Sequence, residues 1–362
     1  MRSARGISLK KVGRGQGFVG GYGYMNDFKY VVKSAMFGMA VGDALGVPVE
    51  FSDRAERDVD PVTDMREYGT HNQPKGTWSD DSSMAFAAMD SLADNGRFIP
   101  EDVMKRFSDW YLNAEYTPYG RVFDIGITCS KAILKYQRGV DPLLCGGGGE
   151  RDNGNGSLMR IMPFALMVAG REDYWSDVAL KETVPILHDA SSLTHGHPRS
   201  LIACVLYASA CHELIWHPEG STRDCLQEAV DKTFAFYDKG RGLFPWLQLE
   251  FQAELEKNAY GRLRDLMKFQ ALPKSSIRGS GYVLDTLEAS FWCLLNSDDY
   301  AECTLKAVNL GEDTDTVGAV AGGLAGLRYG CDRIPAKWLN VLAKKEWIEG
   351  LCERFANTFR MD

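Results

Sequence analysis

The sequence predicts an all-α fold, arranged as a compact single-domain helical bundle. Apolar residues recur at helical spacing along most of the chain, whereas the alternation typical of strands is scarce. Glycine recurs every fourth residue in two segments, which places a bare strip on one face of each expected helix. A chain of 362 residues with 45% hydrophobic content can bury a core, in one large domain or in two smaller ones. No repeat of fixed period divides it.

The first segment, 1–26, differs from the rest in composition. It carries five basic side chains and no acidic one, and glycine is frequent in it. We therefore divide the chain into a basic, glycine-rich N-terminal arm, 1–26, and a helical domain, 27–362. Since chain ends are often unstructured, one interpretation of the arm is a disordered tail without a function. Alternatively, the arm binds a partner. Phe18 and Tyr22 would then be its aromatic anchors, and Arg5 and Arg14 would contact an acidic cleft of the partner.

Two further readings of the arm have less support. An organelle-targeting segment is usually rich in arginine and poor in acids, but the glycines oppose the amphipathic helix that such a segment forms. The Arg-Gly pairs could touch nucleic acid, but the acidic body of the protein disfavours that contact.

Helical periodicity predicts the order of elements in the helical domain. Pro48 ends the first expected helix, the Ser79–Ser82 cluster caps the second, and Pro100-Glu101-Asp102 forms the first turn of the third. The polar, irregular stretch 52–75 predicts a loop. Helices are expected at 27–45, 84–92, 100–111, 127–136, 158–169, 201–216, 225–237, 247–266, 284–296, 300–310 and within the glycine-rich run 317–330.

The two glycine strips predict how the ends of the chain meet. One strip consists of Gly38, Gly42 and Gly46, and the other begins at Gly318 and continues at every fourth residue to Gly330. If the two helices pack antiparallel on these strips, the end of the first lies beside the start of the second. Asp43 and Glu50 would then approach Asp313 and Asp315.

Acidic and hydroxyl side chains are crowded in three segments that lie far apart in the sequence. They contain Asp43 and Glu50, then Ser79-Asp80-Asp81, and finally Asp313-Thr314-Asp315-Thr316. Taken alone, Ser79-Asp80-Asp81 is better explained as a helix cap, and Glu50 as a surface charge. Together the oxygens predict one site for hard divalent cations, with room for two.

Several motifs in a fixed order give the chain a resemblance to a known family. They are Gly42-Asp43-Ala44-Leu45-Gly46, Trp78-Ser79-Asp80-Asp81, Gly154-Asn155-Gly156-Ser157-Leu158-Met159-Arg160, Thr194-His195-Gly196-His197-Pro198 and Gly311-Glu312-Asp313-Thr314-Asp315-Thr316. The chain resembles the ADP-ribosylglycohydrolase family over most of its length. The resemblance implies two Mg²⁺ or Mn²⁺ ions, and it places their ligands at Ser79, Asp80, Asp81, Asp313, Asp315 and Thr316. Ser79 stands where threonine is common and keeps the hydroxyl.

The resemblance also implies a reaction, the removal of ADP-ribose from a modified protein side chain such as arginine. The ions, ~4 Å apart and bridged by Asp315, would hold the ribose hydroxyls and orient a water. Cleavage of a ribosyl bond also needs a carboxylate that manages a proton, and Glu50, Asp80 and Asp315 are the candidates. The sequence does not separate these three.

Substrate contacts are expected at Asp43, Asn155, Gly156, Ser157 and His195. For 154–157 the reason is physical, because backbone N–H groups of a glycine loop before a helix start can point at a phosphate. The pair His195 and His197 suggests zinc, but no third ligand follows at zinc-finger spacing. The resemblance instead implies that His195 contacts the ribose or the diphosphate.

Some bacterial members of this family are similar to immunity proteins against ADP-ribosylating toxins, in which an N-terminal extension blocks the toxin's active site. The resemblance therefore implies two functions, that of a hydrolase and that of a protein that binds a toxin stoichiometrically through its arm. A third possibility, a structural relative without catalysis, is disfavoured by the intact set of Asp80, Asp81, Asp313 and Asp315.

Composition bounds the partners and the compartment. A net charge of −8 and a pI near 5.4 argue against nucleic-acid binding. The nine cysteines contain no Cys-x-x-Cys pair and are odd in number, which favours reduced thiols and a cytoplasmic location. The apolar run 317–330 is too short to span a bilayer and carries Arg328, so no membrane partner is expected.

Overall fold

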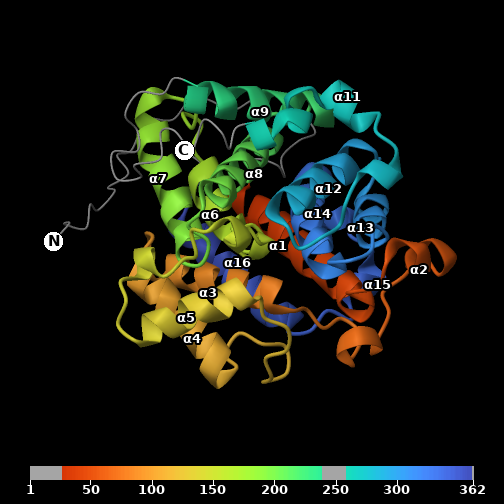
Figure 1. Ribbon diagram of the computed structural model, residues 1–362, viewed down its shortest axis with the longest axis horizontal. Coiled ribbons are helices and arrows are strands. Elements are labelled where there is room, and N and C mark those ends of the chain that lie inside the picture. Colours follow the sequence, from red (N-terminus) through yellow and green to blue (C-terminus); the bar gives the residue numbers. More distant parts are fainter. Residues whose placement is uncertain (1–26, 239–257, 361–362) are drawn as a thin grey trace.

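The computed structural model describes residues 27–238 and 258–360, and within these ranges the secondary structure is helical with a few isolated β-bridges. The all-α prediction is therefore confirmed. The arm 1–26, with its predicted partner contacts, lies outside the described residues. The α-helices are α1 Phe28–Gly46, α2 Arg54–Val59, α3 Asp80–Asn95, α4 Pro100–Asn113, α5 Ile127–Gln137, α6 Met162–Ala169, α7 Asp177–Ser192, α8 Pro198–Trp216, α9 Thr222–Asp238, α11 Leu266–Gln270, α12 Val283–Leu295, α13 Tyr300–Val308, α14 Thr314–Tyr329, α15 Ala336–Leu339 and α16 Lys345–Thr358 (Figure 1).

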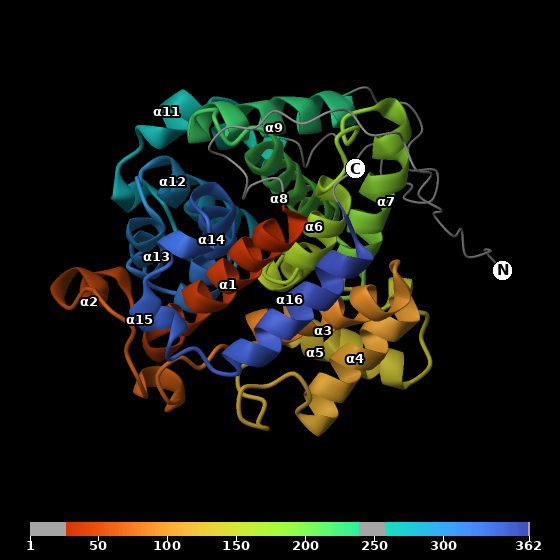
Figure 2. The same ribbon diagram turned by 180° about the vertical axis from the view of Figure 1, so that it is seen from behind.

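Helices α1 and α14 pack against each other on their glycine strips, through the middle of the molecule (Figures 1 and 2). A Cβ atom added to Gly42 would lie 2.0 Å from the carbonyl oxygen of Gly318, and one on Gly38 would lie 2.4 Å from that of Gly322. A Cβ on Gly46 would lie 2.3 Å from the backbone of Asp315. The contacts pair the end of α1 with the start of α14, so the antiparallel arrangement predicted from the glycines is confirmed.

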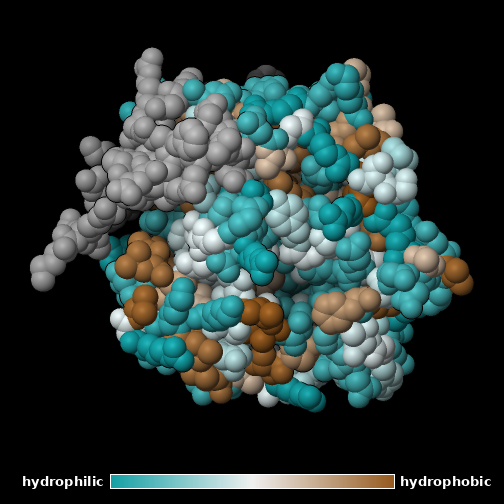
Figure 3. All heavy atoms as spheres, in the orientation of Figure 1, coloured by the Kyte–Doolittle hydropathy of each residue, from teal (hydrophilic) through white to brown (hydrophobic). Residues whose placement is uncertain are grey.

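The other helices cover this central pair. Helices α12 and α13 pack on α14, α16 packs on α1 and α3, and α8 contacts α6, α7, α9 and α14. Figure 1 shows α3, α4 and α5 together at one end of the molecule and α9 with α11 at the opposite end. On the face seen in Figure 3, hydrophobic residues lie in separate groups among hydrophilic ones.

Several predicted boundaries were wrong for identifiable reasons. The stretch 52–75 contains α2, which begins with a capping box between Asp53 and Glu56. The expected helix from Leu158 begins only at Met162, because Pro163 lacks the N–H that a helix interior requires and so belongs in the first turn. Of the expected helix 247–266, residues 239–257 lie outside the described part, and 261–264 form a 3₁₀ turn before α11. Helices α15 and α16 were not predicted.

The segment Phe28–Val49 is long and apolar enough to cross a membrane by length and composition, so the expectation that no run reaches that length was wrong. Within its most apolar window, 89% of the residues are buried inside the protein. The segment is the core helix α1 with the 3₁₀ turn that follows it, which explains its hydropathy. The nine cysteines are free thiols, and all except Cys331 are buried.

Candidate active site

The three acidic segments meet where α1 ends and where α3 and α14 begin. Ser79 is the N-cap of α3, and its hydroxyl accepts a hydrogen bond from the backbone N–H of Asp81. Asp80 and Asp81 therefore lie in the first turn of α3, whereas the sequence suggested the loop before this helix. In the same way, Asp315 lies in the first turn of α14. The backbone N–H groups at both helix starts favour negative charge at this place.

The oxygens of this cluster fit a divalent cation. Asp81 and Asp315 are each 1% exposed, and one oxygen of each carboxylate, as well as Oδ1 of Asp313, is buried without a hydrogen-bond partner. Asp43, Asp81 and Asp315 bring one carboxylate oxygen each within 4.8 Å of the others, and so do Glu50, Asp313 and Asp315. Buried carboxylates without partners are unfavourable, and a hard cation with oxygen ligands removes that penalty.

Thr316 links two of the predicted ligand segments. Its hydroxyl donates to Oδ1 of Asp81 across 3.2 Å, and its backbone N–H donates to Oδ1 of Asp315 across 2.9 Å. Ser79, Asp80, Asp81, Asp313, Asp315 and Thr316 are thus brought together as the sequence predicted. Their role as metal ligands remains a prediction.

Burial controls the ionisation of this cluster. It raises the pKa of Asp80, Asp81 and Asp315 well above the ordinary value, and the neighbouring carboxylates raise it further. Burial also raises the pKa of Glu50 to about 7, although a hydrogen bond with His71 works in the opposite direction. Without a cation, the cluster therefore retains protons at neutral pH.

The metal-free protein is expected to lose thermal stability as the pH rises from 6.5 to 8.0. Asp80, Asp81 and Asp315 bind protons more tightly in the folded than in the unfolded state. Above the ordinary pKa of a carboxyl, the unfolded state has released protons that the folded state keeps, so unfolding becomes more favourable as the pH rises. Bound Mg²⁺ replaces these protons and should reduce the loss. Differential scanning calorimetry at both pH values, with chelator and with Mg²⁺, measures the effect. The same pH dependence in both conditions would contradict the expectation.

Asp43 lies behind the cluster and does not line the cavity described below, so the direct substrate contact expected from the sequence does not fit its position. It is fully buried and accepts hydrogen bonds from the backbone N–H groups of Ser79 and Ser82 and from the Ser82 hydroxyl. Through these bonds a side chain of α1 holds the first turn of α3. Burial raises the pKa of Asp43 to about 7, and the hydrogen bonds from Ser82 and Ser79 counteract that rise.

A cavity of about 240 Å³ opens beside the cluster. Glu50, Asp80, Asp313 and Thr316 line one side of it. The remaining lining residues are Phe51, Asp124, Gly126, Ile127, Thr128, Cys129, Gly154, Asn155, Gly156, Met159, His195 and Gly281. The volume approaches the lower end of the range for ligand pockets, ~300–1,000 Å³.

Gly154, Asn155 and Gly156 of the glycine loop form another part of the cavity wall. The Asn155 amide donates hydrogen bonds of 2.9 Å to Asp313 and to Thr286, which ties this wall to the carboxylates. A Cβ atom on Gly156 would lie 2.7 Å from Sγ of Cys129 and 2.9 Å from Cε1 of His195, so a larger residue there would displace these side chains. Ser157 is fully buried and accepts a hydrogen bond from the Ser191 hydroxyl behind the wall, away from the cavity. Since α6 begins only at Met162, the loop leads into a 3₁₀ turn, Asn155–Ser157, before the α-helix, and the phosphate contact at 154–157 stays a prediction.

The two histidines of the sequence motif have different surroundings. His195 lines the cavity, and its Nδ1 shares a hydrogen bond of 2.9 Å with the Thr194 hydroxyl. Burial lowers the pKa of His195 to about 3, so the ring is neutral and can donate or accept a hydrogen bond. His197 is the N-cap of α8, where its Nδ1 accepts from the N–H of Arg199. This arrangement gives no support to a zinc site.

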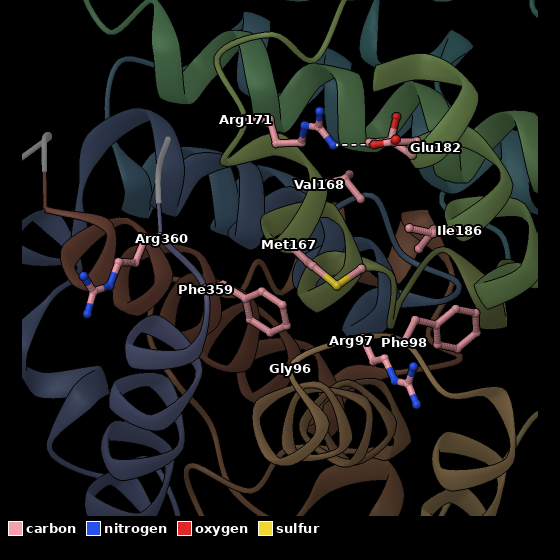
Figure 4. Close-up of a pocket in the computed structure, with 11 residues that line it drawn as sticks. Gly96, Arg97, Phe98, Met167, Val168, Arg171, Glu182, Ile186, Phe359 and Arg360 are labelled. Atoms are coloured by element: carbon pink, nitrogen blue, oxygen red, sulfur yellow. Dashed lines mark hydrogen bonds and ion pairs between the residues drawn. The ribbon is translucent and has the colours of Figure 1, made fainter. Parts of the chain in front are cut away.

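A second cavity, of about 90 Å³, lies between α6, α7 and the end of α16 and contains none of the predicted site residues (Figure 4). Met167, Phe98 and Phe359 give it an apolar lining. The polar pair at its edge, Arg171 and Glu182, is already joined by a hydrogen bond of 2.8 Å. Among the described residues that line it, Glu182 is the only carboxylate and there is no histidine, so we assign this cavity no role in the reaction.

The helical fold and the carboxylate-lined cavity define the class of protein first. Enzymes that hydrolyse a glycosidic bond place carboxylates beside that bond. This cavity presents several carboxylates together with neutral hydrogen-bonding groups. The family model of the ADP-ribosylglycohydrolases matches residues 26–362, and the chain belongs to this family. It is an enzyme that hydrolyses the bond between ADP-ribose and a protein.

Named relatives agree with this assignment. ADP-ribosylarginine hydrolase Tri1 of Serratia proteamaculans is 31% identical, and the match covers 89% of this chain and 78% of that protein. The protein of the same name from Pseudomonas putida is 29% identical over 89% of this chain and 76% of its own length. The ADP-ribosyl-[dinitrogen reductase] glycohydrolase of Rhodospirillum rubrum is 29% identical over 86% of this chain and 90% of its own.

The fold has a solved counterpart, described as an ADP-ribosylglycohydrolase-related protein complex. The TM-score is 0.69 at 30% sequence identity, and the match covers 92% of this chain and 99% of that chain.

Proposed function

We propose that this protein is a hydrolase that depends on two divalent cations, Mg²⁺ or Mn²⁺, and that releases ADP-ribose from modified arginine side chains. The observation that carries the proposal is the set of buried carboxylate oxygens without partners on Asp81, Asp313 and Asp315, of which Asp313 lines the cavity. The two relatives named ADP-ribosylarginine hydrolase support arginine as the acceptor. Bound cations would supply positive charge to the ribose hydroxyls and to the attacking water.

Residues of the chain would transfer the protons and bind the substrate. Glu50 is 4% exposed, lines the cavity and has a pKa of about 7, so it is suited to accept the proton of the attacking water. The water oxygen then forms a bond to C1′ of the ribose, the C1′–N bond breaks, and the leaving guanidine nitrogen takes the proton that Glu50 received from the water. Asn155 and the neutral His195, which also line the cavity, would offer hydrogen bonds to the ADP-ribose.

The direct test measures release of ADP-ribose from an arginine-ADP-ribosylated protein, with Mg²⁺ or Mn²⁺ and with chelator. A serine-linked substrate serves as the comparison. We expect release from the arginine-linked substrate only when the cation is present. Release that persists in chelator would contradict the metal requirement, and release from the serine-linked substrate alone would contradict the acceptor.

We further propose that the protein acts in the cytoplasm as immunity against an ADP-ribosylating toxin. The support is the composition of the arm 1–26, whose basic and aromatic residues suit the acidic cleft of a partner enzyme. The alternative function, occlusion of a toxin's active site by the arm without hydrolysis, rests on the same composition.

Deleting residues 1–26 is expected to leave the rate of ADP-ribose release unchanged and to weaken binding to a purified arginine-specific ADP-ribosyltransferase domain. The reason is that the cavity lining described above consists of residues of the helical domain, between Glu50 and Thr316. A full-length double variant, R5A/R14A, should weaken binding in the same direction, and calorimetric titration measures both. If neither variant changes binding, the occlusion function is wrong.

A further inference from the structure

Three rings from distant parts of the sequence form a row at the cavity. Phe51 follows α1, His71 precedes α3, and Phe123 precedes α5. The centroid of the His71 ring lies 5.8 Å from that of Phe51 and 5.2 Å from that of Phe123. Phe51 lines the cavity and is 67% exposed, so its ring is not part of the core.

Two carboxylates accompany this row. Glu50 precedes Phe51 in the sequence and Asp124 follows Phe123, and both line the cavity. His71 joins them, because its Nε2 is hydrogen-bonded to the Glu50 carboxylate and lies in one group with Asp124, within 4.8 Å. The ring of Phe51 and the carboxylates of Glu50 and Asp124 are therefore presented to the same space, with His71 and Phe123 packed behind them.

The backbone at Phe51 indicates that this exposed ring is held in place and is not incidental. Its φ of 63° lies in the left-handed region, which is unfavourable for a bulky residue. The Phe51 N–H donates to the Glu312 carbonyl, and the Glu312 N–H donates to the Ser52 carbonyl, each across 2.7 Å. Strain of this kind persists only where surrounding contacts enforce it, and it is frequent at ligand sites.

An aromatic ring next to carboxylates is suited to bind a planar cation. A guanidinium ion stacks on aromatic faces and donates paired hydrogen bonds to a carboxylate. An ammonium ion lacks the planar shape, and a hydroxyl acceptor lacks the charge.

We propose that Phe51 and Asp124, with His71 as a positioning residue, form the acceptor subsite that recognises the guanidinium group of ADP-ribosylated arginine. This inference rests on the proposed hydrolysis at the same cavity and adds the residues that select its acceptor. Phe51 provides the stacking face, and Asp124 accepts hydrogen bonds from the guanidinium. His71 holds Glu50 beside them.

A binding measurement tests the subsite without catalysis. The full-length protein, with Mg²⁺ and ADP-ribose present, is titrated with methylguanidinium and, as a ligand of equal charge, methylammonium, and NMR monitors binding. We expect the wild-type protein to prefer methylguanidinium and F51L to bind it about 5-fold more weakly. The control Y119L replaces another exposed ring, outside the cavity lining, and should bind like the wild type.

Kinetics on an arginine-linked ADP-ribosyl peptide provide the second readout. F51L should raise the KM about 5-fold and leave kcat close to that of the wild type, whereas F51W, which retains a ring, should restore the KM. Unchanged methylguanidinium binding in F51L would overturn the subsite even if the wild type releases ADP-ribose. Conversely, guanidinium binding that depends on Phe51 without any release would support the subsite and reject the proposed hydrolysis.

Discussion

Replacing Asp315 by Asn is expected to reduce metal-dependent release of ADP-ribose by about 10³-fold, because the change removes a charge that the cation and the transition state require. Asp315 belongs to both groups of carboxylates that bring their oxygens within 4.8 Å of one another. The isosteric amide still offers Oδ1 to the N–H of Thr316, so the local structure is retained.

The same variant carries an internal control for folding. In the wild type without metal, burial raises the pKa of Asp315 well above its ordinary value, because the charged form is unfavourable there. The neutral amide relieves this penalty, and the metal-free D315N protein should melt no lower than the wild type at pH 8. D109N, which changes a carboxylate paired with Lys105 on α4, should leave release unaffected. Metal-dependent release retained by D315N would reject the proposed role of this residue.

Replacing Gly42 by Ala is expected to destabilise the protein by about 3 kcal/mol or more. The added Cβ would lie 2.0 Å from the Gly318 carbonyl oxygen and 2.6 Å from the carbonyl carbon, and backbone atoms cannot turn aside as a side chain can. The two helices must therefore separate. Chemical denaturation followed by circular dichroism measures the change in free energy of unfolding.

The matched control is Gly350→Ala in α16. Gly350 also lies inside a helix, but a Cβ there meets no atom within 4 Å. Since alanine favours a helix over glycine, G350A should stabilise the protein by roughly 0.5–1 kcal/mol. Equal stability of G42A and the wild type would show that α1 and α14 can move apart at no cost.

The central part of the fold and site could be predicted because its signals are local. A glycine at every fourth position can be recognised without knowing its partner, and two such strips define a close helix pair. The late start of α6 was also predictable from Pro163, and α16 has an amphipathic pattern that could have identified it.

Other parts of the site could not be predicted because their meaning depends on distant contacts. Asp43 forms its hydrogen bonds with N–H groups 36 and 39 residues further along the chain. His71 and Asp124 lie in irregular segments without a periodic pattern, and they reach Glu50 only in the folded protein. The exposed ring of Phe51 has no signal in the sequence, since exposure is a property of the fold.

The hydrogen bonds that Asp43 makes with Ser79 and Ser82 have a consequence for how the protein would bind the proposed cations. They connect α1 to α3 using protein atoms alone, while the glycine contacts fix α14 against α1. The three helices that carry the carboxylates are thus preorganised, and capture of a cation involves little loss of conformational entropy. Affinity for the proposed cations would then depend mainly on desolvation and on the release of protons, so a fall in pH is expected to weaken cation binding without unfolding the protein.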